Sequence, residues 1–226
     1  MDLRVIGDNF GFLIVQGFIG LGAFAGGTLR LAIPAIFLGF ILGIFIGLAR
    51  LARSRWIHFP ATVYVEFFRG VPLVMVIFWF WFMIPTIIGK SLPEYSVALT
   101  AFVVFEAAYL AEIVRSGIQS VQRGQGEGAI ASGLTHHQTM RLVILPQALR
   151  NMIPALVTQF IVLLKDTSLA SIIGYVDLTK AAQIVNNREI RPFELYLFIA
   201  IVYWAPSYGM SQLARRCERR MNPSLS

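Results

Sequence analysis

Charged residues are scarce in this chain of 226 residues: Asp, Glu, Lys and Arg together make up 14%, whereas hydrophobic types make up 57%. A soluble domain of ordinary composition contains about a quarter charged residues. The 19 basic residues outnumber the 12 acidic ones. The basic residues lie between long apolar runs and do not cluster into one basic surface patch, so their excess does not indicate a nucleic-acid binder. The composition predicts an integral membrane protein.

Cysteine is almost absent as well. The single Cys217 lies in an arginine-rich tail, which excludes an internal disulfide and a metal site built from several cysteines. His136 and His137 are adjacent and His58 is isolated, so no histidine pair has the i, i+4 spacing that places two ligands on one side of a helix. The sequence therefore predicts no metal site and no cofactor bound to this chain.

The sequence contains several long apolar runs without charged residues. Residues 31–49 contain no ionisable side chain, and about 20 such residues cross a hydrocarbon core as a helix. Because the runs lack the alternation of barrel strands, we predict an all-α membrane protein, a five-span helical bundle forming one domain over residues 1–226. The expected spans cover residues 28–50, 60–85, 94–116, 147–173 and 193–214.

The stretch 10–29 is also uncharged but holds six glycines, a poor helix composition. We interpret it as an interfacial or re-entrant lead-in, and a sixth span is the alternative. Asp2 and Asp8 near the N-terminus, together with the missing small-residue cleavage site, argue against a cleaved signal peptide.

Basic residues are unevenly divided between the two sides of the five spans. Eleven Lys and Arg residues flank one side and five flank the other. The positive-inside rule assigns the richer side to the cytoplasm. This places the N-terminus outside and the C-terminus in the cytoplasm, and it makes residues 117–146 a long cytoplasmic connection.

Local signals in this connection describe two short helices. The first is expected over residues 127–132 and is ended by Gly133, because glycine tolerates the left-handed conformation found just past a helix. Thr135 followed three residues later by Gln138 fits a capping box, which starts a second helix. That helix is expected to stop near Leu145, since the residue before a proline is pushed out of the α region.

The spacing within the connection resembles a known family. Glu127-Gly128-Ala129 is followed by three residues, Gly133, nine residues and Val143-Ile144-Leu145-Pro146. This pattern resembles the EAA loop of permease subunits of bacterial ABC importers, with Gly128 and Val143 as mild departures. The resemblance implies a coupling helix that docks in a groove of an ATPase subunit, and the alternative is an amphipathic surface helix between spans. The implied coupling residues are Glu127, Gly128, Ala129, Gly133, Val143, Leu145 and Pro146.

Three further stretches resemble the polar amino-acid permeases of the ABC class. They are FFRGVPL at residues 67–73, Tyr109 with EIVRSGI at residues 112–118, and KDTSL at residues 165–169. Within them, PLVMV at 72–76, FEAAY at 105–109 and FIVLLKDTSL at 160–169 are most similar to the glutamate/aspartate branch. The resemblance runs from about Thr28 to the end of the chain.

The resemblance implies a type I ABC importer permease of the bacterial inner (plasma) membrane. Its implied partners are a dimer of ATP-binding subunits, a second permease subunit that is identical or similar, and a periplasmic or extracellular amino-acid-binding protein. Membrane lipid is expected around it and nucleic acid is not. ATP and Mg would be bound by the partner ATPase.

Several polar residues lie inside the expected spans. An ionisable group in hydrocarbon costs about 2.5 to 3.5 kcal/mol, so each should face a pathway or a partner. Glu106, Tyr109 and Glu112 follow one another at i, i+3 steps along one span. Gln159 and Asp166 are seven residues apart on another, nearly two helical turns, so they share a face.

The resemblance to amino-acid permeases implies a substrate cavity made by Gly70, Tyr109, Glu112, Gln159 and Asp166. The carboxylates suit an α-ammonium group, the backbone near Gly70 suits an α-carboxylate, and the Gln159 amide suits a neutral or acidic side chain. Three alternatives stay open. Glu112 pairs with its neighbour Arg115, Asp166 caps a helix restart, or the whole set is structural and the pocket belongs to the partner half.

The phosphate-binding loop of an ATPase is missing. The nearest string, residues 84–91, has Ile84 where the first glycine belongs, so we expect this chain not to be an enzyme and ATP hydrolysis to reside in a separate subunit. One alternative function is an ion-gradient-driven secondary transporter with Glu106, Glu112 and Asp166 as carriers. Another is a non-transporting assembly subunit whose polar residues hold partner helices together.

Overall fold

The computed structural model describes residues 4–21 and 26–221, with side chains as far as Arg216, and over these ranges the chain is helical with no β-strand. This confirms the all-α prediction. The elements are α1 (Arg4–Phe10), the π-helix η1 (Gly11–Ile19), α2 (Thr28–Ala49), α3 (Arg55–Gly70), α4 (Leu73–Ile88), α5 (Glu94–Gln119), α6 (Arg123–Ala131), α7 (His136–Thr139), the π-helix η2 (Met140–Ile144), α8 (Leu145–Asp166), the 3-10 helix η3 (Thr167–Ile173), α9 (Leu178–Glu189) and α10 (Pro192–Met221).

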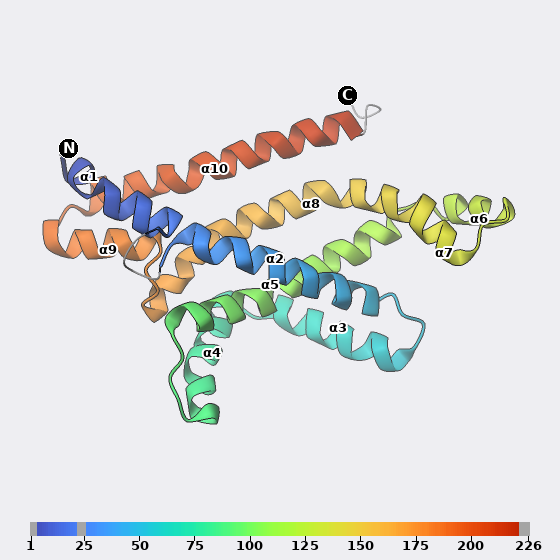
Figure 1. The fold of residues 1–226 in the computed structure, drawn as a ribbon, viewed down its shortest axis with the longest axis horizontal. Coiled ribbons are helices and arrows are strands. Elements are labelled where there is room, and N and C mark those ends of the chain that lie inside the picture. The colour runs from blue at the N-terminus through green and yellow to red at the C-terminus, as the bar shows by residue number, and fades with distance from the viewer. Residues whose placement is uncertain (1–3, 22–25, 222–226) are drawn as a thin grey trace.

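The helix α5 lies at the centre of the bundle, where it packs most extensively with α2 and also contacts α3, α4 and α8 (Figure 1). Small residues permit this close packing. A Cβ atom added to Gly43 of α2 would lie 2.8 Å from the Cβ atom of Leu110, and one added to Gly47 would lie 2.8 Å from the Ala111 carbonyl oxygen. Helices in lipid associate through such small-residue contacts because burial of apolar surface does not drive them together.

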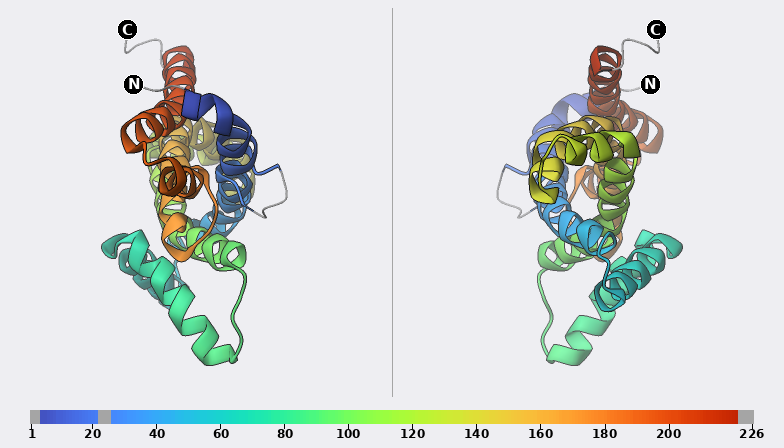
Figure 2. Two further views of the ribbon diagram at one scale, coloured as in Figure 1. Left: turned by 90° about the vertical axis from the view of Figure 1, so that its left-hand side faces the viewer. Right: turned by 90° about the vertical axis from the view of Figure 1, so that its right-hand side faces the viewer.

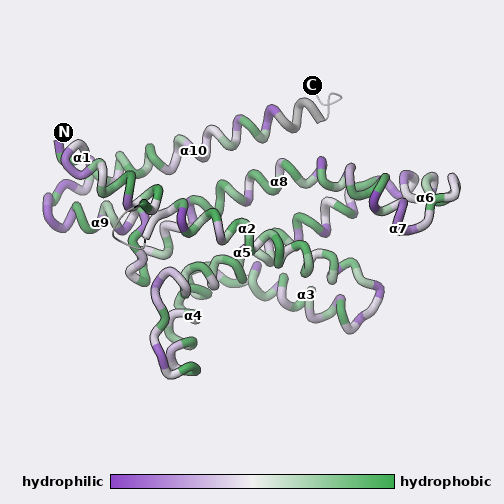
Figure 3. Tube along the Cα trace, viewed as in Figure 1, coloured by the Kyte–Doolittle hydropathy of each residue, from purple (hydrophilic) through white to green (hydrophobic). Residues whose placement is uncertain are grey.

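The two ends of the elongated molecule differ. At one end, α6 and α7 project beyond the bundle; at the other, α1, η1 and α9 gather near the N-terminus (Figure 1). Polar residues concentrate at both ends, and the hydrophobic residues lie mainly along the helices between them (Figure 3). In both end-on views, α3 and α4 project away from the remaining helices (Figure 2). This arrangement matches a bundle whose middle lies in lipid.

The expected second span, residues 60–85, is broken in the structure. Its two halves, α3 and α4, are bent by 105° at residues 71 and 72. Pro72 has no amide hydrogen to donate and forces the preceding residue out of the α region; Val71 accordingly adopts φ −111° and ψ 150°. The single continuous helix expected here was therefore wrong, and the chain forms a bent pair.

Three helices in the described ranges are long and apolar enough to cross a membrane, or four if the bent pair counts as one span: Thr28–Ala49, Glu94–Gln119 and His136–Ile173, with Arg55–Gly70 plus Leu73–Ile88 as the pair. The fifth expected span lies in α10, which has 30 residues but carries Pro206 and several polar residues in its second half. The helical stretch 4–19 is shorter than a full span, and residues 22–25 of the expected lead-in lie outside the described residues.

The helix that begins after Thr135 does not stop near Leu145, which corrects that expectation. It continues through η2 into α8, and Leu145 itself is α-helical with φ −59° and ψ −43°. The five residues before this point adopt π geometry, which widens the turn and relieves the clash between a proline ring and the preceding carbonyls. The sequence did not predict α9, whose N-cap residue, Asp177, accepts a hydrogen bond from the Lys180 amide through its side chain.

Candidate translocation and coupling sites

Arginines from three elements surround Glu112 on α5. Arg50 at the end of α2 donates to Oε2, Arg115 donates to both oxygens at 3.1 and 2.5 Å, and Arg69 of α3 lies 3.9 Å away. The Arg50 side chain is only 9% exposed and also reaches Glu66 at 3.4 Å. The ion pair with Arg115, one of the alternatives that the sequence left open, is present in the structure.

The bend between α3 and α4 places two candidate residues together. Gly70 ends α3, and a Cβ atom added there would meet nothing within 4 Å, so the backbone at the bend is open. The guanidinium of Arg69 lies 5.7 Å from the centre of the Tyr109 ring, in cation–π contact. An open backbone beside an arginine and an aromatic ring is suited to a carboxylate.

A second polar group lies between α5 and α8. Gln159 Nε2 donates to Glu106 Oε2 at 2.8 Å, and the other oxygen, Oε1, is buried with no hydrogen-bond partner. Asp166, at the end of α8, is close enough for its charge to act on both Glu106 and Tyr109. Asp166 is partly exposed, and no capping hydrogen bond from its side chain is formed at η3.

The structure thus divides the predicted cavity residues into two neighbouring groups. Gly70, Tyr109 and Glu112 lie with the arginines near the α3–α4 bend, and Gln159 and Asp166 lie across α5 beside Glu106. The sequence missed Arg50 as a partner, because it comes from α2 and is far from α5 along the chain. No group of three or more potential metal ligands exists among the described residues.

We call residues 117–146 the coupling segment, and its second helix begins with the capping box that the sequence predicted. Thr135 Oγ1 accepts a hydrogen bond from the Gln138 amide at 3.3 Å, and the Gln138 side chain accepts one from the Thr135 amide at 2.9 Å. Gly133, just before it, has φ 89°. A Cβ atom there would meet nothing within 4 Å, so the backbone conformation, and not crowding, is what requires glycine.

Hydrogen bonds hold the coupling segment to α8. Gln147 donates to Gln125 of α6 at 3.5 Å, and Asn151 donates to Ser120 Oγ at 2.9 Å. The seven predicted coupling residues lie on this unit: Glu127 and Gly128 exposed and Ala129 buried on α6, Gly133 exposed at the corner, Val143 half-buried in η2, and Leu145 and Pro146 exposed at the start of α8.

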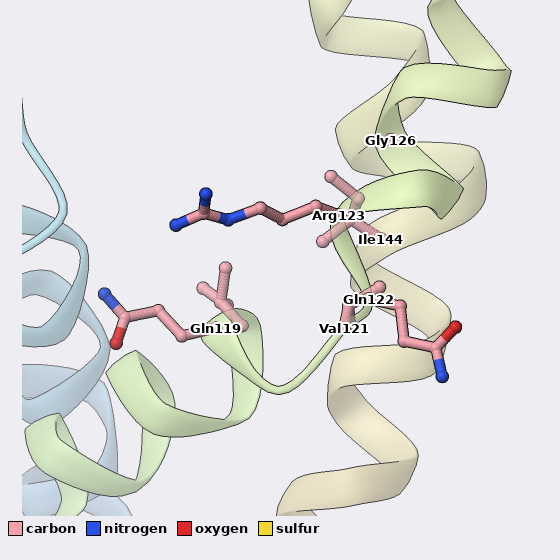
Figure 4. A pocket seen from close by; sticks show the side chains of 7 residues that line it. Gln119, Val121, Gln122, Arg123, Gly126 and Ile144 are labelled. Carbon is pink, nitrogen blue, oxygen red and sulfur yellow. The ribbon is translucent and has the colours of Figure 1, made fainter.

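A hollow of about 530 Å³ lies between the end of α5, α6 and η2. In Figure 4, Gln119 and Arg123 project to the same open side of it, and Ile144 of η2 closes the opposite wall. Four apolar side chains around this end are also exposed, as expected of a surface that another protein covers: Ile130, Met140, Leu142 and Leu145.

Comparison with known proteins identifies the fold. Residues 39–223 match the family described as "Binding-protein-dependent transport system inner membrane component". An experimental structure described as an amino acid ABC transporter with histidines superposes with a TM-score of 0.88 at 34% identity, covering 97% of this chain and 99% of that one. The MetNI methionine ABC transporter, at 20% identity and a TM-score of 0.71, shares the fold.

Two curated relatives are similar over most of their length. The glutamate/aspartate import permease protein GltK of Escherichia coli O6:H1 is 40% identical over 201 residues, covering 85% of this chain and 89% of that protein. A probable glutamine ABC transporter permease protein, GlnP of Bacillus subtilis, is 42% identical over 196 residues with the same coverage. The chain therefore belongs to the family of binding-protein-dependent transport system inner membrane components, and within it to the amino-acid permeases of ABC importers, with their type I fold.

Proposed function

We propose that this chain is the transmembrane subunit of an ATP-driven importer for an acidic amino acid, glutamate or aspartate. The observation that carries the proposal is the continuous helix from His136 to Ile173, which joins the capped coupling segment to Gln159 and Asp166. A partner that moves the coupling segment would move these two residues with it. The chain itself does not hydrolyse ATP; a dimer of ATP-binding subunits, with its ATP and Mg, performs that step.

In the proposed cycle, ATP closes the ATPase dimer and α6 with α7 follows as a rigid unit. The hydrogen bond from Gln147 to Gln125 of α6 carries this motion into α8, and Asn151 joins α8 to Ser120 at the end of α5. The spans then open toward the outside, where a binding protein delivers the amino acid. A second permease subunit, identical or similar, completes the pathway. The N-terminus lies outside and the C-terminus in the cytoplasm.

The choice of an acidic substrate rests on charge. Arg69 is 40% exposed beside the open backbone at Gly70. A substrate with a cationic side chain would be bound best by a carboxylate, but residue 159 is a glutamine, whose amide suits an acidic side chain. The oxygens of Glu112 accept hydrogen bonds from Arg50 and Arg115, and Arg69 lies 3.9 Å from Oε2, so Glu112 is the counter-ion of this arginine cluster. Asp166 is then the carboxylate left for the α-ammonium group, with Tyr109 on the same wall.

Uptake into vesicles tests the class and the substrate together. The chain is reconstituted with its ATPase and binding protein, and labelled glutamate uptake is measured with ATP or with an imposed ion gradient. We expect ATP-dependent uptake that aspartate inhibits and arginine does not. Inhibition by glutamine alone would shift the substrate to a neutral amide, and uptake driven by the gradient alone would refute the importer.

Substitution of Gly133 tests the coupling role. Valine is strained at a φ of 89°, so Gly133→Val should abolish uptake while the protein still reaches the membrane. Gly124→Ala is the matched control, because this helical glycine of α6 is not among the predicted coupling residues, has open space around its Cβ position and an ordinary helical backbone, and it should transport normally. Normal ATP-driven uptake by Gly133→Val would contradict the proposed lever.

A further inference from the structure

The first turn of α3 presents aromatic side chains to the surroundings. Trp56 is 91% exposed and Phe59 is 61% exposed, although each could bury a large apolar area in a folded core. Tryptophan has an apolar ring and a polar N–H group, a combination that is enriched where hydrocarbon meets water. This turn is therefore expected to lie where apolar hydrocarbon meets polar headgroups and water.

Two unpaired positive charges lie at the same turn. Arg53 and Arg55 are exposed, and no ion pair joins either of them to a carboxylate among the residues that the structure describes. The nearby Glu66 is engaged by Arg50 instead. A partner with negative charge would complement these two guanidinium groups.

The two features meet in one concave place. A hollow of about 400 Å³ is lined by Arg55, Trp56, Phe59 and Pro60. It lies at the turn between α2 and α3, toward the same end of the molecule as α6 and α7 (Figure 1). One wall is thus cationic and the others are aromatic or apolar, and the helix continues from there toward the middle of the bundle.

We infer that this hollow binds an anionic phospholipid. Arg53 and Arg55 contact the phosphate and headgroup, Trp56 lies at the glycerol level, and Phe59 with Pro60 contacts the upper acyl chain. A single anionic lipid accounts for the charge, the exposed aromatics and the position at the boundary between the polar end and the apolar middle of the molecule.

The site is connected to the Glu112 cluster. The turn that carries Arg53 and Arg55 begins at Arg50, whose side chain pairs with Glu112, and His58 Nδ1 lies 2.7 Å from the Arg50 carbonyl oxygen. A lipid bound here fixes the turn that orients Arg50. The lipid therefore supports the arginine cluster beside the proposed translocation site.

Fluorescence quenching tests the site independently of transport. The full-length chain with Trp79, Trp81 and Trp204 changed to Phe keeps Trp56 as its only tryptophan. It is reconstituted in phosphatidylcholine bilayers containing brominated phosphatidylglycerol or brominated phosphatidylcholine. We expect phosphatidylglycerol to quench Trp56 with an apparent affinity at least about fivefold higher, the contribution of one arginine near an anionic surface.

The arginines are tested by paired variants of equal net charge. Arg53→Gln with Arg55→Gln should remove the preference, whereas Arg123→Gln with Arg141→Gln, two exposed arginines elsewhere on this end of the molecule, should retain it. Equal quenching by the two lipids in the parent chain would overturn the inference. So would quenching by neither lipid, which would mean that Trp56 lies in water or against a second copy of the chain, or a preference that survives loss of Arg53 and Arg55.

Discussion

At the scale of single residues, Glu106 shows how a buried carboxyl depends on one neighbour. It is 1% exposed, and among the described residues its side chain has one hydrogen bond, which comes from Gln159. Gln159→Leu should lower the unfolding free energy by about 1 to 3 kcal/mol, the cost of leaving a buried polar group unsatisfied. Thermal unfolding in detergent measures this effect.

A double-mutant cycle separates the pair from its surroundings. Glu106→Gln keeps an acceptor oxygen for Gln159, so this variant should remain close to the parent in stability. If Gln159→Leu is equally destabilising in the Glu106→Leu background, the hydrogen bond contributes nothing and the assigned pairing is incorrect.

Asp177 makes stability depend on pH. It is completely buried at the start of α9, and burial raises its pKa from 3.8 to about 6, although the Lys180 amide and the Tyr203 hydroxyl donate to it at 2.8 and 3.0 Å. The folded state holds this proton more tightly than the unfolded state. The contribution to unfolding free energy is therefore largest below pH 4, falls by on the order of 3 kcal/mol as pH rises through 6, and is constant above that.

The variant Asp177→Asn isolates this contribution, because asparagine is also a good N-cap residue. The difference in melting temperature between the parent and the variant should change between pH 4 and 7 and level off above it. A difference that stays constant across this window would show that Asp177 does not titrate there.

At the scale of helices, the most extensive contact is between α2 and α5. Gly39, Gly43 and Gly47 recur every four residues, and a Cβ atom at Gly43 would already crowd Leu110 and the Ala111 amide. Gly43→Leu should push the two helices apart and destabilise the bundle by several kcal/mol, since overpacking alone typically costs about 1 to 3 kcal/mol.

The matched control is Gly7→Leu, at a helical glycine whose added Cβ would meet nothing within 4 Å. It should leave the melting temperature of the purified protein nearly unchanged. A Gly43→Leu variant as stable as this control would contradict the close approach of α2 and α5.

Apolar runs and caps were readable from the sequence, whereas contacts between distant elements were not. The all-α class, the capping box at Thr135 and the need for glycine at residue 133 follow from composition or from a few neighbouring residues. Two proline effects were misjudged: Pro72 breaks the second span, but Pro146 is accommodated by a π turn. The outcome at each proline depends on whether tertiary packing holds the helix on both sides, which local rules do not contain.

In the candidate site, too, the sequence predicted what depends on nearby residues but not the contacts between different helices. Periodicity placed Tyr109 and Glu112 on one face of α5, and Gln159 and Asp166 on one face of α8. The roles of Arg50 and Glu106 required the structure, because their partners come from other helices. The helix α9 was missed because it is short and polar, and its N-cap, Asp177, is buried by α2 and α10 contacts.

At the scale of the whole molecule, the lone cysteine offers a test of orientation. Cys217 lies near the end of α10, which the proposal places in the cytoplasm. A membrane-impermeant maleimide should label Cys217 only after cells are opened. Glu189→Cys in a Cys217→Ser background, at an exposed position of α9, should be labelled in intact cells, and the opposite result for both positions would invert the topology.

The continuous helix from His136 to Ile173 can transmit a change from the substrate site to the coupling segment as well as from the coupling segment to the substrate site. Gln159 lies 23 residues beyond its start, a distance of about 35 Å along a helix. If attachment of a partner at the near end changes the affinity for a ligand at the far end, thermodynamic reciprocity requires the ligand to change the partner's affinity by the same factor. Under the proposed function, an amino acid bound at Gln159 would then alter the affinity of the coupling segment for the ATPase, and the helix alone would transmit site occupancy to that partner.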